Sequence, residues 1–232
     1  MASDSGLPKR LRRLSSSLVC DILDDYYDGV TSKKYLMRSQ IRPVFPGMKV
    51  SGVAKTFSGG LSAGTAETAE GPPTSEPNQK GNAALESIGP GQVVVYGTNR
   101  CRIAACWGEL MSTAASTRGG AGLVTDGLAR DLDRIRTIRP VFPVFSEGST
   151  PSSGKGRFAL REFDVPIWCG GVPVTPGDLI LGDLDGVVVI PKDIALDVVT
   201  KSEDRLKTER TVRTAFRKKA PISDIMRRYK VG

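Results

Sequence analysis

The chain has 232 residues, of which 39% are hydrophobic and 25% are charged, and its formal net charge is +8. This length fits two small domains or one large α/β or all-β unit, and we expect a single domain. No apolar run approaches the roughly 20 residues that a membrane-spanning helix needs, so the composition argues against a membrane protein. The positive charge favours an anionic ligand only weakly, because the lysines and arginines are scattered along the chain.

The chain contains no histidine and four cysteines. Without histidine, acid/base chemistry must use carboxylates, Lys, Tyr, Cys or water. The cysteines (Cys20, Cys101, Cys106 and Cys169) show no C-x-x-C spacing, and the chain begins with no apolar signal region, which favours reduced thiols and a cytoplasmic location. A mitochondrial targeting sequence is the alternative for the basic segment "LPKRLRRLSSSL", but Asp4 precedes it and it runs into a helical pattern.

The first half of the chain predicts a helix, short strands and a loop, in that order. Residues 8–25 repeat apolar side chains at helical spacing, and "RPVFPGMKVSGVAKTFSGG" alternates Val with polar residues as short strands do. Residues 58–80 are rich in Gly, Pro, Ser and Thr and predict a long loop. A loop of this length either serves the function or is a neutral surface insert.

The second half predicts strands and then a helical tail. "SIGPGQVVVYG" (87–97) and "VTPGDLILGDLDGVVVIP" (174–191) each place a Pro-Gly turn before a β-branched run, as β-hairpin elements do. Asp183 and Asp185 fit the turn of the second segment. From residue 192 to residue 232, apolar residues at helical intervals among many charges predict an exposed helix and a short terminal helix.

The most informative stretch is residues 102–136, which read as a strand–helix–strand–helix unit. Residues 102–106 and 121–125 suit strands, and residues 109–118 suit the helix between them. Gly108 would then precede a helix N-terminus, where backbone N–H groups lack partners and the helix dipole is positive. A small carboxylate could bind these amides, because glycine lets a ligand approach the backbone closely.

The segment "DGLARDLDR" (126–134) follows the second predicted strand. Because the carboxyl ends of neighbouring parallel strands share one edge, we expect Glu109 and the pair Arg130–Asp131 to face the same cleft. Arg130 offers a planar fork that suits a carboxylate, and Asp131 offers an oxygen to a hard cation such as Mg²⁺.

Ordinary structural explanations exist for the same residues. Glu109 and Asp131 lie in the first turns of predicted helices, where an acidic residue is favourable by about 0.3 to 1 kcal/mol without any catalytic role. Asp126 belongs to a common turn dipeptide, and Cys106 and Trp107 are expected to pack in the core. For either acid taken alone, both explanations stay open.

Five segments in order resemble the RraA-like family, which includes the class II pyruvate aldolases acting on 4-hydroxy-4-methyl-2-oxoglutarate. They are "SSLVCDILDD", "WGELMSTAA", "DGLARD", "PVF" at 143–145 and "PGDLILGDLDGVVVIP". The resemblance implies that residues 1–232 form a single α/β domain of the β/β/α swivelling type. It also implies trimers or hexamers with active sites between subunits.

The resemblance also assigns roles to residues in the middle of the chain. It implies that Asp131 binds a divalent metal directly and that Glu109 holds water on that metal, with Mg²⁺ expected and Mn²⁺ as the alternative. Arg130, together with Gly108 and the amides of Leu110 and Met111, would bind the pyruvyl part of the substrate.

A further acid would come from the C-terminal helix of the neighbouring subunit. Glu209 in "KTER" is the best match, and Glu203 is the fallback because the tail aligns without a sharp motif. The loop 58–80 and "YGTNRCRIAA" depart from the aldolase pattern, and Asn99–Arg100 brings charge where small residues are more usual. We expect these loops to surround the mouth of the site.

The implied function is a divalent-metal-dependent lyase that cleaves 4-hydroxy-2-oxo acids to pyruvate through a metal-stabilised enolate, and also decarboxylates oxaloacetate. The alternative is a non-catalytic RraA-type regulator that binds a ribonuclease or another protein. Retention of Glu109, Arg130 and Asp131 favours the enzyme. Direct RNA binding is a third hypothesis, which lacks support from any aromatic-rich recognition motif.

Overall fold

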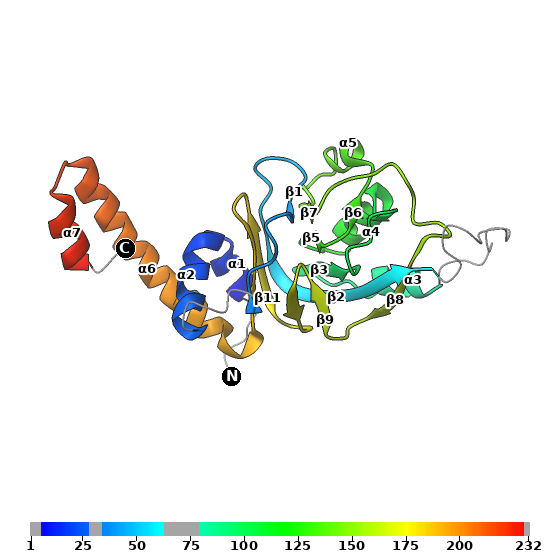
Figure 1. Cartoon of the computed structure of the whole chain (residues 1–232), viewed down its shortest axis with the longest axis horizontal. Coiled ribbons are helices and arrows are strands. Elements are labelled where there is room, and N and C mark those ends of the chain that lie inside the picture. The colour runs from blue at the N-terminus through cyan, green and yellow to red at the C-terminus, as the bar shows by residue number, and fades with distance from the viewer. Residues whose placement is uncertain (1–5, 28–33, 63–78, 230–232) are drawn as a thin grey trace.

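The computed structural model describes residues 6–27, 34–62 and 79–229, which form a curved β-sheet with helices on both sides (Figure 1). The strand order of the main sheet is β1–β7–β5–β3–β2–β11–β12, and β8 also pairs with β2. The strands of this sheet are β1 (Arg42–Pro43), β2 (Val50–Leu61), β3 (Gln92–Gly97), β5 (Gly122–Thr125), β7 (Val144–Ser146), β8 (Phe158–Phe163), β11 (Leu179–Asp183) and β12 (Gly186–Ile190).

Two small two-stranded sheets complete the β-structure: β4 (Ala105–Trp107) with β6 (Leu128–Ala129), and β9 (Ile167–Cys169) with β10 (Val172–Val174). The helices are α1 (Leu7–Leu11), α2 (Ser16–Tyr27), α3 (Gln79–Glu86), α4 (Glu109–Thr117), α5 (Leu132–Ile135), α6 (Ala195–Arg217) and α7 (Ile222–Tyr229), with a 3-10 turn at Lys192–Ile194. Within the described ranges, no helix is long and apolar enough to cross a membrane.

The centre of the main sheet is parallel, and its edges are antiparallel. β2 pairs in parallel with β3, β3 with β5, and β5 with β7. The carboxyl ends of these four strands therefore meet at one edge of the sheet, which is where α/β folds place ligands. At the far ends of the strand order the sheet curls back on itself, because Arg42 of β1 donates hydrogen bonds to the carbonyls of Leu184 and Asp185 in the β11–β12 turn.

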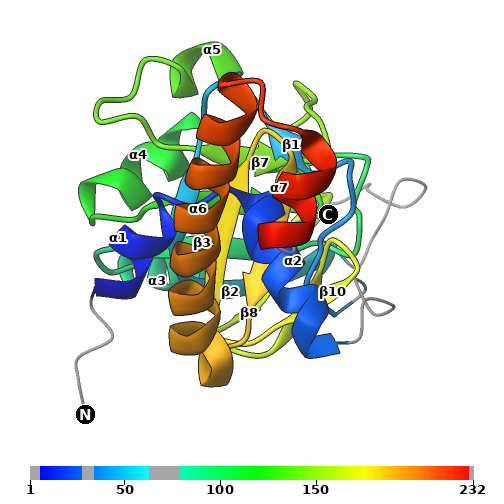
Figure 2. The same cartoon turned by 90° about the vertical axis from the view of Figure 1, so that its left-hand side faces the viewer.

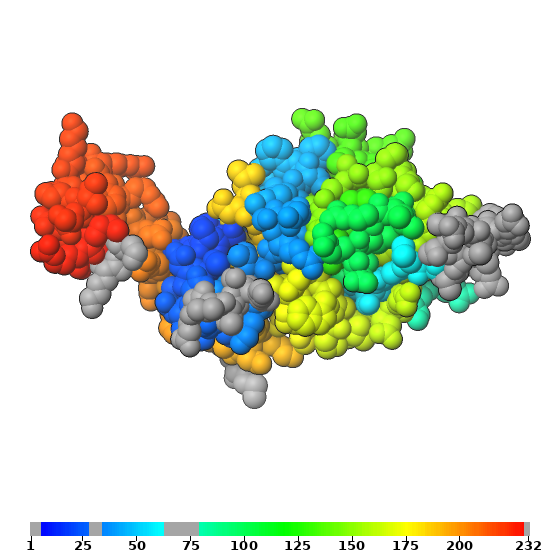
Figure 3. Space-filling view, in the orientation of Figure 1, coloured from blue at the N-terminus to red at the C-terminus, as the bar shows by residue number. Residues whose placement is uncertain are grey.

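Helices cover the sheet on two sides. Figure 2 shows α1, α2 and α6 in front of the sheet, where Leu11, Val19 and Val198 pack with Leu181 and Val188 of β11 and β12. α3 and α4 lie on the other side and bury their alanines against β3 and β5. The outer half of α6 and the whole of α7 stand away from the body as an arm (Figures 1 and 3).

The N-terminal segment forms two helices where the sequence predicts one over residues 8–25. The first helix ends at Leu11 and the second begins at Ser16. The N–H and the hydroxyl of Ser16 donate hydrogen bonds to the carboxylate of Asp183 at 2.8 and 2.5 Å. Asp183 thus does more than shape the β11–β12 turn, because it satisfies free donors at the start of α2.

The loop predicted over residues 58–80 overlaps regular elements at both of its ends. β2 continues through Leu61, because residues Phe57 to Leu61 pair with β8. α3 begins at Gln79, and residues 63–78 lie outside the described part of the chain. Strand pairing, which local composition does not reveal, decides the end of β2.

Candidate functional site

The residues predicted to carry the chemistry fold around the parallel ribbon of β4 and β6. β4 leads through Gly108 into α4, and β6 leads through Arg130 and Asp131 into α5. The N–H of Arg130 donates to the carbonyl of Trp107 at 3.0 Å, which extends the ribbon by one residue. The two strands therefore end side by side and bring the predicted residues to one edge.

The sequence correctly predicts that Glu109 and Arg130–Asp131 lie at one edge, but it predicts the wrong strand as the neighbour of β4. Residues 121–125 form β5, which belongs to the main sheet, whereas β4 pairs with the two-residue strand β6. A two-residue strand lies below what hydrophobic periodicity can detect. The predicted meeting of Glu109 with Arg130–Asp131 does occur, but through β6.

A glycine is needed at position 108 because neighbouring side chains leave no room for a Cβ atom, and not because of its backbone conformation. Its φ of −145° and ψ of −169° are extended values that any residue adopts. A Cβ atom added here would lie 2.8 Å from Oδ2 of Asp131 and 3.2 Å from Cγ and Nε of Arg130. The side chains of Arg130 and Asp131 thus lie directly over the Gly108 backbone.

Asp131 has an unusual backbone and an unusual orientation. Its φ of 58° and ψ of 35° are left-handed values, which non-glycine residues adopt seldom, although Asp is among those enriched there. It occupies the N-cap position of α5, yet its carboxylate caps no amide of that helix. Instead Oδ2 lies 3.5 Å from both the N–H of Glu109 and Nε of Arg130. Capping of α5 therefore does not explain why an aspartate occupies this position.

The start of α4 presents free donors beside this carboxylate. Gly108 at the N-cap has no side chain to cap the helix, and Asp131 accepts only from the first amide, that of Glu109, at 3.5 Å. Geometry leaves the next N–H groups of the first turn without intrahelical acceptors. Leu110, in the first turn, is 76% exposed. The amides of Leu110 and Met111 are therefore free to meet an anion, aided by the positive end of the helix dipole.

Buried side chains hold this edge in place. Nε1 of Trp107 donates to Oγ of Ser112 at 2.8 Å, and that hydroxyl donates to the carbonyl of Gly108 at 3.0 Å. The Trp107 ring is buried and stacks on Phe142 at 6.5 Å. Cys106 is also buried, and burial raises the pKa of its thiol to about 12, so it packs as a neutral thiol and is no nucleophile near neutral pH.

The donor set fits a magnesium-type metal, although the described residues contain no group of three His, Cys, Asp or Glu side chains able to hold an ion. Mg²⁺ commonly takes only one or two protein carboxylates and keeps several water ligands. The Asp131 side chain is 38% exposed and its oxygens are not used for capping, while Oε1 of Glu109 accepts a hydrogen bond from Thr113 at 2.7 Å. Asp131 would bind such an ion directly, and Glu109 would hold its water.

The structure does not bring Glu209 or Glu203 to this edge within one chain. Both belong to α6, which leaves the body on the side opposite to α4 (Figure 1). Oε2 of Glu209 lies 3.6 Å from Nη2 of Arg213. Glu203 forms a bidentate ion pair with the guanidinium of Arg10 in α1. The bond to Arg10 lowers the pKa of Glu203 and gives this acid a structural role.

Two groups of residues near the carboxyl edge of the main sheet escape the sequence-based prediction. Asp126 is not merely a turn former: it is 3% exposed and accepts hydrogen bonds from the N–H and hydroxyl of Thr98 and from the N–H of Gly170. Glu147 has a fully buried side chain and pairs with three arginines distant in sequence. The charge at Asn99–Arg100 is the only signal for this cluster that the sequence carries.

Comparison with known proteins agrees with this geometry. Residues 18–189 match the model of the RraA-like family, described as Aldolase/RraA. The chain belongs to the RraA-like family. The matched range includes β4, α4, β6 and the residues around Gly108 and Asp131.

Curated relatives and solved structures extend the match. A Halalkalibacterium halodurans protein with the provisional name 4-hydroxy-4-methyl-2-oxoglutarate aldolase is 33% identical over 79% of this chain and 77% of its own. A Thermus thermophilus protein named 4-hydroxy-4-methyl-2-oxoglutarate aldolase is 35% identical over 50% of this chain and 70% of its own. Streptomyces coelicolor RraAS2, described as an unusual member of the RNase ES inhibitor RraA family, superposes with a TM-score of 0.75 at 28% identity, over 92% of this chain and 98% of its own. The predicted α/β fold class is confirmed.

Proposed function

We propose that this protein is a divalent-metal-dependent lyase that cleaves 4-hydroxy-2-oxo acids to pyruvate. One observation carries the proposal: the ends of β4 and β6 place the N-terminus of α4, a half-exposed guanidinium and a half-exposed carboxylate around the backbone of Gly108. These are the groups that an oxo acid needs at its carboxylate and at its keto oxygen. The aldolase names of two relatives support the same reaction class.

The chain's own residues would fix the substrate at its carboxylate end. Arg130 has a side chain that is 38% exposed, and its fork can bind both oxygens of a carboxylate. The amides of Leu110 and Met111 donate from the other side. Because Trp107 and Ser112 hold the start of α4, these donors are positioned before the substrate arrives.

A divalent metal held by Asp131 would supply a Lewis acid for the 2-keto oxygen and for the charge of the enolate. In the retro-aldol direction the 4-hydroxyl loses its proton and the C3–C4 bond breaks. The electron pair of that bond forms the enolate of pyruvate, and the 4-hydroxyl becomes the carbonyl of the second product. Glu109 would hold the water that takes up the hydroxyl proton and returns a proton to C3. Loss of CO₂ from oxaloacetate would give the same enolate, so decarboxylation belongs to the same proposal.

A second chain would complete the site. The arm formed by the outer half of α6 and by α7 stands clear of its own body, which suits a contribution to a neighbouring copy (Figure 3). Glu209 lies on the arm and its side chain is 32% exposed, whereas Glu203 is committed to Arg10. We therefore favour Glu209 as the acid supplied across an interface of a trimer or hexamer.

The experiment is a coupled assay for pyruvate over a panel of oxo acids that includes 4-hydroxy-4-methyl-2-oxoglutarate and oxaloacetate. We expect release that requires Mg²⁺, stops with a chelator, and falls by about a hundredfold or more in Asp131→Asn. Asp133→Asn is the matched control, because Asp133 is exposed and lies on α5 two residues away. Silence over the whole panel would contradict the lyase and favour a regulator.

A further inference from the structure

A second charged region lies at the carboxyl edge of the parallel strands β2, β3, β5 and β7. Asp126 follows β5, Glu147 follows β7, and the turn Thr98–Arg102 follows β3. This region precedes β4, whereas Gly108 follows β4, so the two regions lie at opposite ends of that strand. It is therefore separate from the edge at which the lyase chemistry is proposed.

Two neighbouring cavities open here, with volumes of about 540 and 510 Å³. Gly59, Asn99 and Arg100 line both of them. Arg102 and Arg161 line the first cavity, and Arg38 lines the second. Gly59 and Gly60 of β2 line the first cavity, and a Cβ atom added at Gly60 would lie 3.1 Å from Nε of Arg161.

The positive charge here exceeds the negative charge. Among the described residues, four arginines line the cavities, and the nearby carboxylates are Asp126, which lines the second cavity, and Glu147, whose buried side chain pairs with Arg38, Arg100 and Arg102. Asp126 is already saturated with donors from Thr98 and Gly170. Excess guanidinium charge in a partly enclosed space attracts an anion.

Glu147 explains how the arginines gather without being neutralised. Its side chain is fully buried and lies 3.7 Å from Nη1 of Arg38 and 3.7 Å from Nε of Arg100, and it also hydrogen-bonds to Arg102. One carboxylate thus holds three guanidinium groups. Among the described residues, Nη1 of Arg38 and Oε1 of Glu147 are buried without a hydrogen-bond partner and face each other at 3.7 Å, so this pair is held by charge alone.

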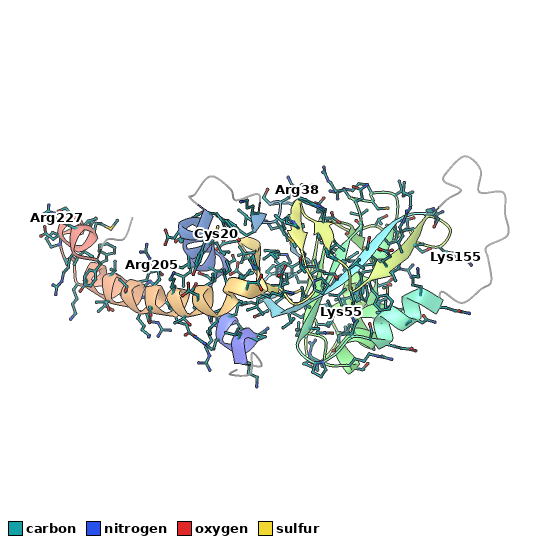
Figure 4. The ribbon with its side chains drawn as sticks, turned by 90° about the horizontal axis from the view of Figure 1, so that it is seen from below. Cys20, Arg38, Lys55, Lys155, Arg205 and Arg227 are labelled. Carbon is teal, nitrogen blue, oxygen red and sulfur yellow. The ribbon has the colours of Figure 1, made fainter. Side chains whose placement is uncertain are left out.

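Backbone geometry directs two of these groups into the cavities. Asn99 and Arg100 have φ values of 52° and 58°, and a left-handed conformation is seldom adopted by arginine. Strain of this kind persists where the surroundings impose it and is often associated with a ligand site. Arg38 is anchored by its N–H to the carbonyl of Gly170, and Figure 4 shows it beside the β9–β10 hairpin.

We propose that the paired cavities bind a small organic anion with two oxyanion groups, carboxylate or phosphate. One group would lie between Arg38 and Arg100, and the other would lie toward Arg102 and Arg161. Arginine forks match both kinds of oxyanion, and the two joined cavities suit a ligand with charge at each end. This inference does not depend on the proposed lyase activity.

Trp168 provides a reporter for the test. It lines the second cavity and is 68% exposed, whereas Trp107, the other tryptophan of the chain, is buried. The full-length protein would be titrated with succinate, glycerol phosphate and acetate while Trp168 fluorescence is recorded. We expect saturation by at least one dianion, at a concentration at least about tenfold lower than for acetate.

Variants locate the binding site. We expect Arg100→Gln and Arg161→Gln each to weaken dianion binding by about tenfold or more, measured by calorimetry, while Arg130→Gln and the surface control Arg118→Gln bind normally. Arg161 is exposed and bonds only to the carbonyl of Leu61 among the described contacts, so its loss leaves the fold intact. Trp168→Phe should remove the fluorescence signal and keep the calorimetric one.

The outcomes separate the two possible ligand classes and the two proposals. Saturation by succinate alone assigns a dicarboxylic acid, and saturation by glycerol phosphate alone assigns a phosphorylated ligand; both support the site. The proposal is overturned if no dianion saturates, if acetate binds as tightly as succinate, if Arg100→Gln and Arg161→Gln bind normally, or if binding is lost in Arg130→Gln. None of these results changes the outcome of the pyruvate assay with Asp131→Asn.

Discussion

The two ends of β4 use charge in opposite ways. At the Gly108 end, the side chains of Arg130 and Asp131 lie 3.5 Å apart, both are 38% exposed, and Oδ2 of Asp131 also lies 3.5 Å from the N–H of Glu109. At the Arg102 end, the side chain of Glu147 is fully buried and binds three arginines from two segments, Arg38 and the turn that carries Arg100 and Arg102. Charge that remains available at the first end suits chemistry, whereas charge at the second end holds the structure together and still leaves guanidinium groups facing a cavity.

Glu147→Gln would produce the largest loss of stability. Removing one partner of a wholly buried ion pair costs roughly 3–5 kcal/mol, but the three arginines here are between 38% and 53% exposed and can be hydrated. We therefore expect the free energy of unfolding to fall by about 2 kcal/mol in denaturant titrations. Glu162→Gln on β8 is the control, and an equal loss in both variants would contradict the structural role of Glu147.

Gly108→Ala tests the other end of β4, where we expect a loss of activity. The added Cβ would lie 2.8 Å from Oδ2 of Asp131, so the carboxylate and Arg130 must move. We expect pyruvate release to fall by about tenfold or more, because small displacements at a catalytic site are costly. In Gly89→Ala the nearest contact of the new Cβ is Oε1 of Gln92 at 3.6 Å, which is ordinary, so this variant should retain activity.

Glu203→Gln removes a partly exposed ion pair that lies away from both ends of β4. It should lower the free energy of unfolding least among these variants. Arg10 lowers the pKa of Glu203, so the pair stabilises the fold above the ordinary pKa of Glu, about 4.3, and this contribution disappears as the pH falls through the lowered value. Because the side chains of Arg10 and Glu203 are 36% and 32% exposed, we expect Glu203→Gln to lower the free energy of unfolding by less than about 1 kcal/mol at pH 7.

The measurement is the difference in melting temperature between wild type and Glu203→Gln as a function of pH. The difference should be constant above about pH 5 and shrink below about pH 4. A difference that grows toward acidic pH would contradict the ion pair. A loss of pyruvate release with unchanged stability would instead return Glu203 to the list of catalytic acids.

The sequence predicts the Gly108 end of β4 well and the Arg102 end poorly. Gly108, Glu109, Arg130 and Asp131 lie in two short segments with helix and strand signals, so local patterns place them. Arg38, Arg102 and Glu147 meet only because β7, β3 and the β9–β10 hairpin come together in the folded chain, and no local signal records that meeting. The missed strand β6 and the extension of β2 have the same cause, since long-range pairing decides both.

The most direct test of the central claim is hydrogen exchange at the methyl group of pyruvate in D₂O, followed by proton NMR. Exchange requires removal of a proton from C3 and therefore reports the enolate without depending on the choice of aldol substrate. We predict Mg²⁺-dependent exchange in the wild type and in Arg118→Gln, and none above background in Asp131→Asn. Exchange that persists in Asp131→Asn, or that is absent from the wild type with either Mg²⁺ or Mn²⁺, would contradict an enolate-forming site at the ends of β4 and β6.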